Sequence, residues 1–333
     1  MAITAAARPA GRTIPAAWYD WLFLAASAWL VGGGFLDTWA HNHVAKLETF
    51  FTPWHGVLYT GYAACAVVLG ARWLRDRSLP DGYRLSLLGC AFFAVGGVAD
   101  MLWHTVFGIE RSISAVLSPS HLWLIISGAL IVTGTVRAAR AGADGRAPVI
   151  AVLGGTVAAS YIGLVTQFAQ PYMQRVAAGF ERGALPYDAA VQIGLFGVML
   201  QSALLVALVV KLRERFDLPF GSLTLIVGLP AVLIAFGTTV DFMVLVAVLG
   251  GLAGDVWLLV LRGRPAVFAF AFPATLYLFY IVSIVVAYGT WWEVHAVTGI
   301  VVVAGVTGWL VQSVIRGPGP VGARADQAPG GSA

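Results

Sequence analysis

The chain has 333 residues, of which 59% are hydrophobic and 11% are charged, and its net charge is +4. Soluble domains are roughly 45–50% apolar and about 25% charged, so this composition excludes an ordinary soluble domain. The basic residues lie at the ends of apolar segments, and their excess indicates membrane orientation rather than nucleic-acid binding.

Ten apolar segments follow one another along the chain. Each has about the length needed to cross roughly 30 Å of hydrocarbon as a helix, and backbone groups in lipid must be satisfied within the segment. The sequence therefore predicts an all-α, polytopic integral membrane bundle. The segments lie near 18–36, 55–73, 85–104, 119–136, 148–167, 188–210, 219–237, 241–261, 266–287 and 294–314.

Ten crossings place both termini on the same side, and 16 of the 20 Lys and Arg residues lie on that side. Because basic loops stay in the cytoplasm, we expect a plasma or inner membrane protein with both termini cytoplasmic. Residues 1–17 form the expected leader, and residues 315–333, rich in Gly, Pro and Ala, form an expected disordered tail. All six histidines fall on the opposite, extracytoplasmic side.

A signature that occurs twice divides the first four segments into two hairpins, at 18–74 and 85–140, with six further helices over 148–314. The unit is predicted to be a two-helix hairpin with the signature at its outer turn, and weaker echoes at Leu185–Asp188 and Trp291–His295 suggest five such hairpins. The first copy contains Asp37, His41, Glu48 and Thr52-Pro53-Trp54-His55, and the second contains Asp100, His104, Glu110 and Ser118-Pro119-Ser120-His121.

The spacing within each copy suits a metal ion. An Asp and a His four residues apart share one face of a helix. Thr or Ser followed by Pro is a helix-start signal, which fixes His55 and His121 on the first turn of the returning helix. Two imidazoles and one carboxylate leave coordination positions open, and such ligands suit copper, iron or zinc without ranking them.

Several other residues are weaker candidates. Glu48 and Glu110 are predicted to hold the imidazoles of the ligands, as metal-bound histidines require. His43, and His295 with Glu293, are alternative ligands. Asp255 is a deep acid, which indicates either a functional site or a contact toward the basic side. Trp39, Trp54 and Trp103 are expected to wall the pocket.

The second copy resembles the ligand motif in the C subunit of the copper membrane monooxygenases, which oxidise methane, ammonia or short hydrocarbons. The resemblance covers residues ~20–140 only and implies copper bound by Asp100, His104 and His121. Asp37, His41 and His55 match the same pattern, and the family carries a related second set of ligands. The histidines are spaced more widely here than in the family, and the chain is longer than the family's C subunit.

Four functions remain open from the sequence. The first is a copper protein that oxidises small hydrophobic substrates with dioxygen, as a homo- or hetero-oligomer in the lipid bilayer. The second is metal uptake or delivery without catalysis. The third is a zinc-dependent membrane hydrolase, resembling the alkaline ceramidases and adiponectin receptors, with Ser118 or Ser120 supplying a hydroxyl. The fourth is a structural or assembly subunit.

Overall fold

The computed structural model describes residues 18–44, 51–108, 113–139, 147–236 and 242–317. These ranges form helices and no β-sheet. The elements are α1 (Trp18–His43), α2 (Pro53–Asp76), α3 (Arg84–Phe107), α4 (Ile113–Leu117), α5 (Pro119–Val132), α6 (Gly134–Ala138), α7 (Ala147–Val165), η1 (Gln167–Ala169), α8 (Pro171–Gln174), η2 (Gly179–Glu181), α9 (Tyr187–Arg213), α10 (Ser222–Phe236), α11 (Met243–Val260), α12 (Pro265–Tyr288) and α13 (Val294–Arg316).

The predicted membrane architecture is confirmed. Within the described ranges, nine helical spans are long and apolar enough to cross a bilayer, with α5 and α6 together forming one of them. The shorter apolar helix α10 accounts for the remaining expected segment. The protein is therefore an all-α, polytopic membrane protein.

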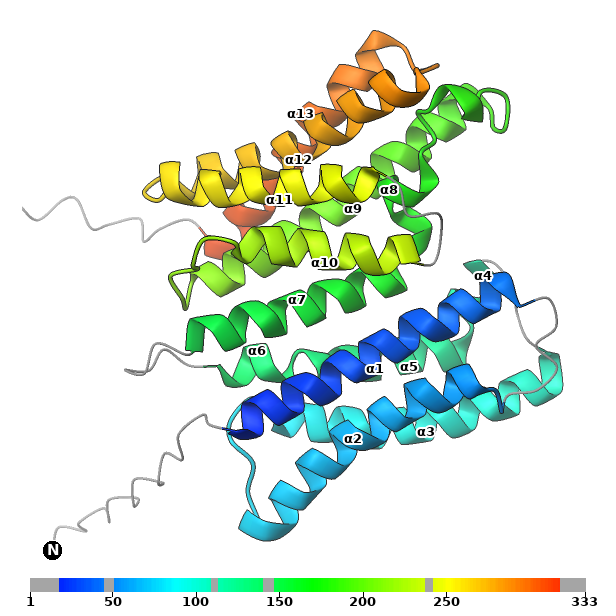
Figure 1. The fold of residues 1–333 in the computed structure, drawn as a ribbon, viewed down its shortest axis with the longest axis vertical. Coiled ribbons are helices and arrows are strands. Elements are labelled where there is room, and N and C mark those ends of the chain that lie inside the picture. Colours follow the sequence, from blue (N-terminus) through cyan, green and yellow to red (C-terminus); the bar gives the residue numbers. More distant parts are fainter. Residues whose placement is uncertain (1–17, 45–50, 109–112, 140–146, 237–241, 318–333) are drawn as a thin grey trace, which may run out of the picture.

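The first four spans form the two predicted hairpins. α1 packs along α2, and α3 packs along α5 (Figure 1). α7 then contacts α1 and α10 more extensively than it contacts α9. α9 lies mainly against α13. The connection over residues 166–186, which contains η1, α8 and η2, is long enough to separate α7 from α9, so the hairpin pattern is interrupted there.

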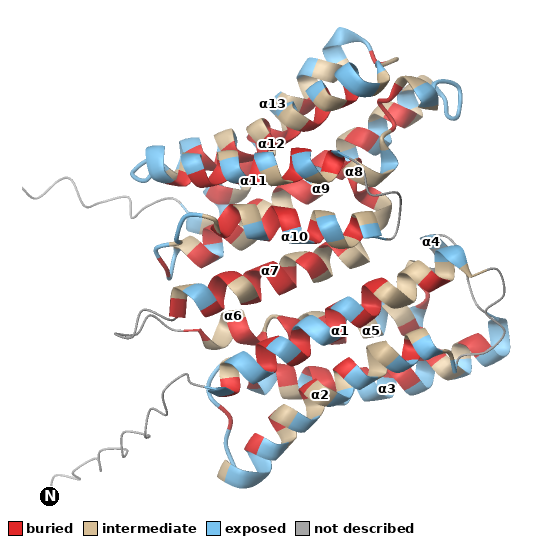
Figure 2. Cartoon of the chain, in the orientation of Figure 1, coloured by how far each residue is buried: buried red, intermediate tan, exposed pale blue. Residues whose placement is uncertain are grey.

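Burial identifies the centre of the bundle. In α7, 67% of the membrane-spanning window is buried, against 22% in α2 and in α13, so α7 is central and the other two are peripheral (Figure 2). One hydrophobic core lies on the side of α1–α5, and another lies among α9–α13. α7 contributes side chains to both cores and joins them.

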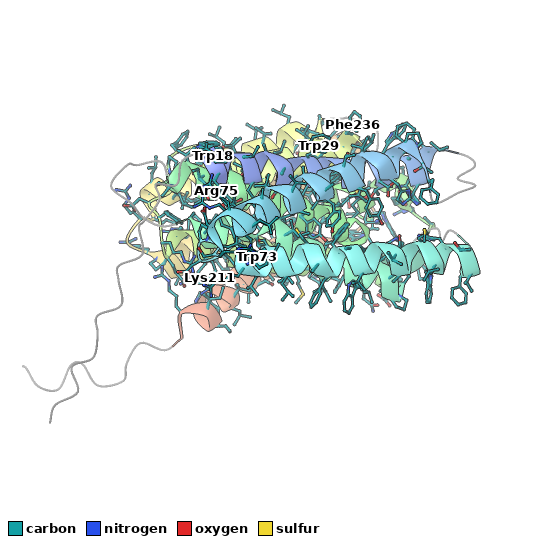
Figure 3. The ribbon with its side chains drawn as sticks, turned by 90° about the horizontal axis from the view of Figure 1, so that it is seen from below. Trp18, Trp29, Trp73, Arg75, Lys211 and Phe236 are labelled. Atoms are coloured by element: carbon teal, nitrogen blue, oxygen red, sulfur yellow. The ribbon has the colours of Figure 1, made fainter. Side chains whose placement is uncertain are left out.

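The two ends of the bundle differ in chemistry. The first residues of α1 and the last residues of α13 lie at the same end (Figure 1). Arg75 and Lys211, from helices distant in sequence, lie near that end with Trp18 and Trp73 (Figure 3). Because consecutive spans alternate in direction, both Asp-His signatures fall at the opposite end.

A pair of glycines lets α1 and α2 approach closely. A Cβ on Gly61 would lie 2.6 Å from the backbone nitrogen of Leu30, and one on Gly33 would lie 2.7 Å from the Cα of Leu58. Such separations leave no room for a side chain, so both positions require glycine. The close crossing sets the distance between the ends of α1 and α2, where the first signature lies.

Asp255 is a helix cap rather than a site in the membrane interior. It is fully buried in α11 and accepts hydrogen bonds from the backbone nitrogens of Leu223 (2.9 Å) and Thr224 (3.0 Å). The Thr224 hydroxyl donates to it as well, at 2.6 Å. These donors belong to the first turn of α10, whose backbone N–H groups have no partner within the helix. The deep acid therefore stabilises the start of α10.

We expect Gly61→Ala to destabilise the protein by about 1–3 kcal/mol, because the added methyl group must push α1 and α2 apart. The control is Gly70→Ala on the same helix, where a Cβ meets nothing within 4 Å. Thermal unfolding of both variants in detergent measures the difference. Equal stability of the two variants would contradict the close-crossing interpretation.

Candidate metal centre

Both returning helices start as the sequence predicts. Thr52 caps α2 and Ser118 caps α5, each accepting a hydrogen bond from the backbone N–H of the histidine three residues on. Proline occupies the first helical position in both helices. His55 and His121 are thereby fixed on the first turn. Each faces the carboxylate that the preceding helix of its hairpin provides.

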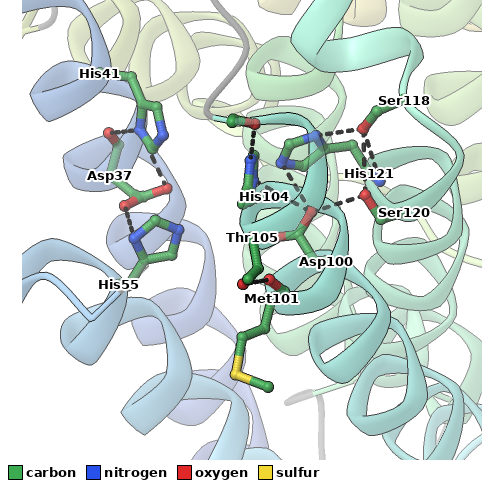
Figure 4. Close-up of polar contacts among 11 residues, drawn as sticks. Asp37, His41, His55, Asp100, Met101, His104, Thr105, Ser118, Ser120 and His121 are labelled. Carbon is green, nitrogen blue, oxygen red and sulfur yellow. Dashed lines mark hydrogen bonds and ion pairs between the residues drawn. The ribbon is translucent and has the colours of Figure 1, made fainter. Parts of the chain in front are cut away.

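The second signature forms a compact group at the ends of α3 and α5 (Figure 4). Nε2 of His104 lies 3.5 Å from Oδ1 of Asp100, and Nε2 of His121 lies 3.4 Å from the same oxygen. Asp100 is 2% exposed. One buried carboxylate oxygen therefore faces two imidazole nitrogens.

The other side of each imidazole is held in place. Nδ1 of His104 lies 3.1 Å from the carbonyl oxygen of Gly108. A carbonyl can only accept, so this contact places the proton on Nδ1 and leaves the Nε2 lone pair directed at Asp100. Nδ1 of His121 lies 2.7 Å from Oγ of Ser118. These contacts resemble those that orient metal-bound histidines.

The carboxylate is held as well. Ser120 Oγ donates a hydrogen bond of 2.9 Å to Oδ1 of Asp100, within the buried group. Ser118 and Ser120, from the same Ser-Pro-Ser turn, therefore orient one imidazole and the carboxylate respectively. Sequence reasoning assigned Ser118 to helix capping and missed the contact between Ser120 and Asp100.

The distances inside the second group fit an ion better than direct hydrogen bonds. N–H···O hydrogen bonds in proteins span about 2.7–3.2 Å. Two ligands about 2.0–2.1 Å from a tetrahedral ion lie about 3.3 Å apart. The separations of 3.4 and 3.5 Å between Asp100 and the two imidazoles are close to that value. The donor set and its spacing therefore suit a divalent transition metal.

The first signature also brings together Asp37, His41 and His55, but here the Nδ1 atoms of the histidines, not Nε2, face the carboxylate (Figure 4). Nδ1 of His55 lies 3.4 Å from Oδ1 of Asp37, whereas Nδ1 of His41 lies 3.6 Å from Oδ2. Nδ1 of His41 also donates to the backbone oxygen of Asp37, at 2.9 Å. That bond leaves the Nε2 lone pair of His41 for a ligand role.

One polar contact of the second group has no counterpart in the first. Trp54 occupies the position that Ser120 has in the second copy, so no hydroxyl reaches Asp37 from there. Oδ1 of Asp37 is buried and has no hydrogen-bond partner in the described ranges. A buried carboxylate oxygen without a donor is costly, and a cation held between Asp37 and His55 would remove that cost.

Both groups line the same cavity, of about 630 Å³. Its walls are largely apolar and come from both hairpins, from α7 and from the segment after α7. The aromatic lining side chains are Tyr59, Phe93, Tyr161 and Phe168. The two candidate metal groups therefore share one chamber.

The expectation that three tryptophans wall the pocket is wrong, since none of them is among the side chains that line the cavity. Trp39 stacks on His43 and contacts Trp54 edge-on, and Trp103 packs against Phe107. These rings lie at helix ends, where amphipathic aromatic residues are favoured at the membrane interface. Tyr59, which stacks on His55, takes the role expected of them.

The structure does not place the weaker ligand candidates in either candidate metal group. His43 and His295 are exposed, and neither belongs to a metal-ligand group in the described part of the chain. Glu293 is exposed, and its backbone nitrogen donates to the Tyr187 hydroxyl. Glu48 and Glu110 lie outside the described residues, so their predicted contact with the imidazoles stays a prediction.

Sequence reasoning could have found Tyr59 but not Tyr161. Tyr59 lies four residues after His55, on the same face of α2. Tyr161 belongs to α7, outside both repeats, and enters the cavity wall only because α7 packs against α1. Comparison of the chain with protein-family profiles, with curated proteins and with solved structures found no match.

We expect Ser120→Ala to weaken metal binding at the second group by about 10- to 100-fold, the usual effect of removing a contact that orients a ligand. Ser127→Ala is the control, because the Ser127 hydroxyl is buried on the same helix but donates to the Trp123 carbonyl. Titration of the metal-free protein against a competing chelator measures the affinity. An unchanged affinity in Ser120→Ala would show that the serine is only structural.

Proposed function

We propose that this protein binds copper at Asp37, His41 and His55 and at Asp100, His104 and His121. We further propose that it oxidises small apolar molecules within the shared cavity. The observation that carries the proposal is the convergence of both ligand groups on one largely apolar chamber inside a membrane bundle. The motif's resemblance to the C subunit of the copper membrane monooxygenases supports copper as the metal.

The ligand chemistry supports a reactive centre rather than a closed structural one. Two neutral imidazoles and one carboxylate supply three ligands per group, which leaves positions for dioxygen, water or substrate. Copper held in this way supplies the capacity to activate dioxygen. The chain's own part is to orient the ligands through Ser118, Ser120 and the Gly108 carbonyl, and to surround them with apolar walls.

The cavity supports a small hydrophobic substrate. Its volume of about 630 Å³ falls in the range of about 300–1,000 Å³ that is usual for small-molecule sites. Leu30, Leu58 and Leu164 contribute apolar surface, and no Lys or Arg is among the lining side chains of the described residues. Such a chamber favours molecules that partition into the bilayer over charged ones.

The reaction needs an external reductant. Insertion of one oxygen atom of dioxygen into a C–H bond yields an alcohol, and the second atom leaves as water with two electrons and two protons. An electron donor in the membrane or an associated partner subunit has to supply the electrons. We therefore propose that the protein works as part of a homo- or hetero-oligomer.

The basic side chains near one end of the bundle support a particular orientation of the protein in the membrane. Arg75 and Lys211 lie near the end that carries the start of α1 and the end of α13 (Figure 3). By the positive-inside rule this end faces the cytoplasm. Both metal groups then face the extracytoplasmic side of the plasma or inner membrane.

A zinc-dependent hydrolase is the second candidate, because two histidines and one carboxylate also form the ligand set of hydrolytic zinc sites. Ser118 accepts the backbone N–H of His121 as the cap of α5, and Ser120 donates to Asp100, so both hydroxyls already have structural roles. Metal uptake without catalysis receives less support, since Asp255, the deep acid that a transport path would use, caps α10.

Elemental analysis of the purified protein tests the proposal. We expect about two copper ions per chain, and about one after either Asp100→Ala/His104→Ala or Asp37→Ala/His41→Ala. His43→Ala/His295→Ala is the matched control, because both histidines lie outside the groups. Zinc at the same stoichiometry would favour the hydrolase, and absence of any metal after reconstitution would overturn both.

The copper-loaded protein is then tested for oxygenation. Vesicles that contain the protein, a short alkane, dioxygen and an external reductant should produce the corresponding alcohol, with label from ¹⁸O₂. Either double variant of the ligands should lose most of this activity. Full copper loading without alcohol formation under several reductants would contradict the enzymatic part of the proposal and favour metal storage or delivery.

A further inference from the structure

A second cavity lies in the other half of the bundle. It has a volume of about 100 Å³ and is lined by side chains from α7 to α12. It adjoins the cavity that the two candidate metal groups line, since Met173 lines both. Liquid water occupies about 30 Å³ per molecule, so this space has room for about three water molecules or one molecule of about four carbon atoms.

One wall of this cavity is polar and comes from the connection after α7. The side chain of Gln170 is 9% exposed and forms no hydrogen bond within the described ranges. The hydroxyl of Tyr172 is buried and likewise has no hydrogen-bond partner there. Buried polar groups in native proteins are almost always hydrogen-bonded, so the unpartnered Tyr172 hydroxyl, on the same cavity as the Gln170 amide, points to a ligand.

Gln201 adds an oriented acceptor. It is 9% exposed, and its side-chain nitrogen donates to the Thr166 hydroxyl at 3.0 Å. This bond leaves the amide oxygen of Gln201 as an acceptor. The cavity wall thus combines a hydroxyl, which can donate or accept, with two amides.

Apart from Arg175, the remaining described surface of the cavity is mainly apolar. No Asp, Glu, Lys or His is among the described side chains that line the cavity. Arg175 lines it, but its guanidinium donates to the Tyr172 carbonyl and the Tyr288 hydroxyl and lies over the Tyr288 ring. The apolar wall is formed mainly by Leu204, Leu205, Leu208, Ile226, Val227 and Ala231.

We propose that this cavity is a binding site for a small neutral alcohol or ketone, with its oxygen at Gln170, Tyr172 and Gln201 and its hydrocarbon body against α9 and α10. A single oxygen on a short chain satisfies the buried polar wall and fills the apolar remainder. A cationic ligand would require a carboxylate, and the described walls provide none. The site goes beyond the proposed function and does not depend on metal binding.

Photolabelling with 3-azi-1-butanol, a butanol that carries a diazirine, tests this site in the full-length protein in lipid nanodiscs. We expect saturable labelling of residues that line this cavity alone, such as Tyr172 or Tyr277. Excess 1-butanol or 2-butanone should suppress it, whereas butane should not. Peptide mass spectrometry locates the label.

Gln170→Leu is the decisive variant, because the substitution keeps the size of the side chain and breaks no hydrogen bond in the described structure. We expect it to weaken suppression by 1-butanol about fivefold, as the loss of one hydrogen bond implies. Gln174→Leu is the control, because Gln174 lines the metal cavity but not this one. Size-exclusion profiles and metal content confirm that both variants keep their fold.

Three results would overturn the proposal. The first is labelling that does not saturate and spreads over lipid-facing side chains, which would mean that the alcohol only partitions into the bilayer. The second is equal suppression in Gln170→Leu and in the wild type. The third is stronger competition by butyrate than by 1-butanol, which would assign an anionic ligand to Arg175.

Discussion

The burial of one carboxylate between two imidazoles, at the end of each N-terminal hairpin, is the constraint on which the site depends. Ionised side chains within a membrane bundle are costly unless they are paired. Asp100 meets that requirement through Ser120 and two nearby imidazoles. The caps that start α2 and α5, and the close crossing of α1 and α2, position the groups that surround each carboxylate.

The two copies of the signature have diverged in their supporting contacts. In the second copy a single carboxylate oxygen faces both imidazoles and accepts a hydrogen bond from a serine. In the first copy the two imidazoles face different oxygens of Asp37, and tryptophan replaces that serine. The two candidate metal groups therefore share the same residue types and differ in the contacts that hold them around one cavity.

The two halves of the bundle differ in the kind of residues that they bury. The helices α1–α5 carry both candidate metal groups, and α9–α13 form a larger hydrophobic core. α7 lies between them and contributes to both cavities, with Tyr161 on one side and Ile162 on the other. Packing against α7 therefore helps to determine the shape of both cavities, although α7 carries none of the six residues of the candidate metal groups.

The sequence by itself determined the helical membrane fold and the residues that make up both candidate metal groups. Each of these depends on local features: the length of apolar runs, the four-residue spacing on one helical face, and the Thr-Pro or Ser-Pro start of the next helix. Local rules of this kind can be applied without knowing which helices become neighbours.

Only the tertiary structure decided which surfaces meet. The long connection between α7 and α9 interrupts the hairpin pattern, so α9 lies against α13 and α7 against α1 and α10. That packing brings Tyr161 to the cavity shared by the candidate metal groups, leaves Trp39, Trp54 and Trp103 outside it, and directs Asp255 to the start of α10. Apolar helix faces are chemically alike, so the sequence does not state their partners, whereas side-chain volume and close glycine contacts select them.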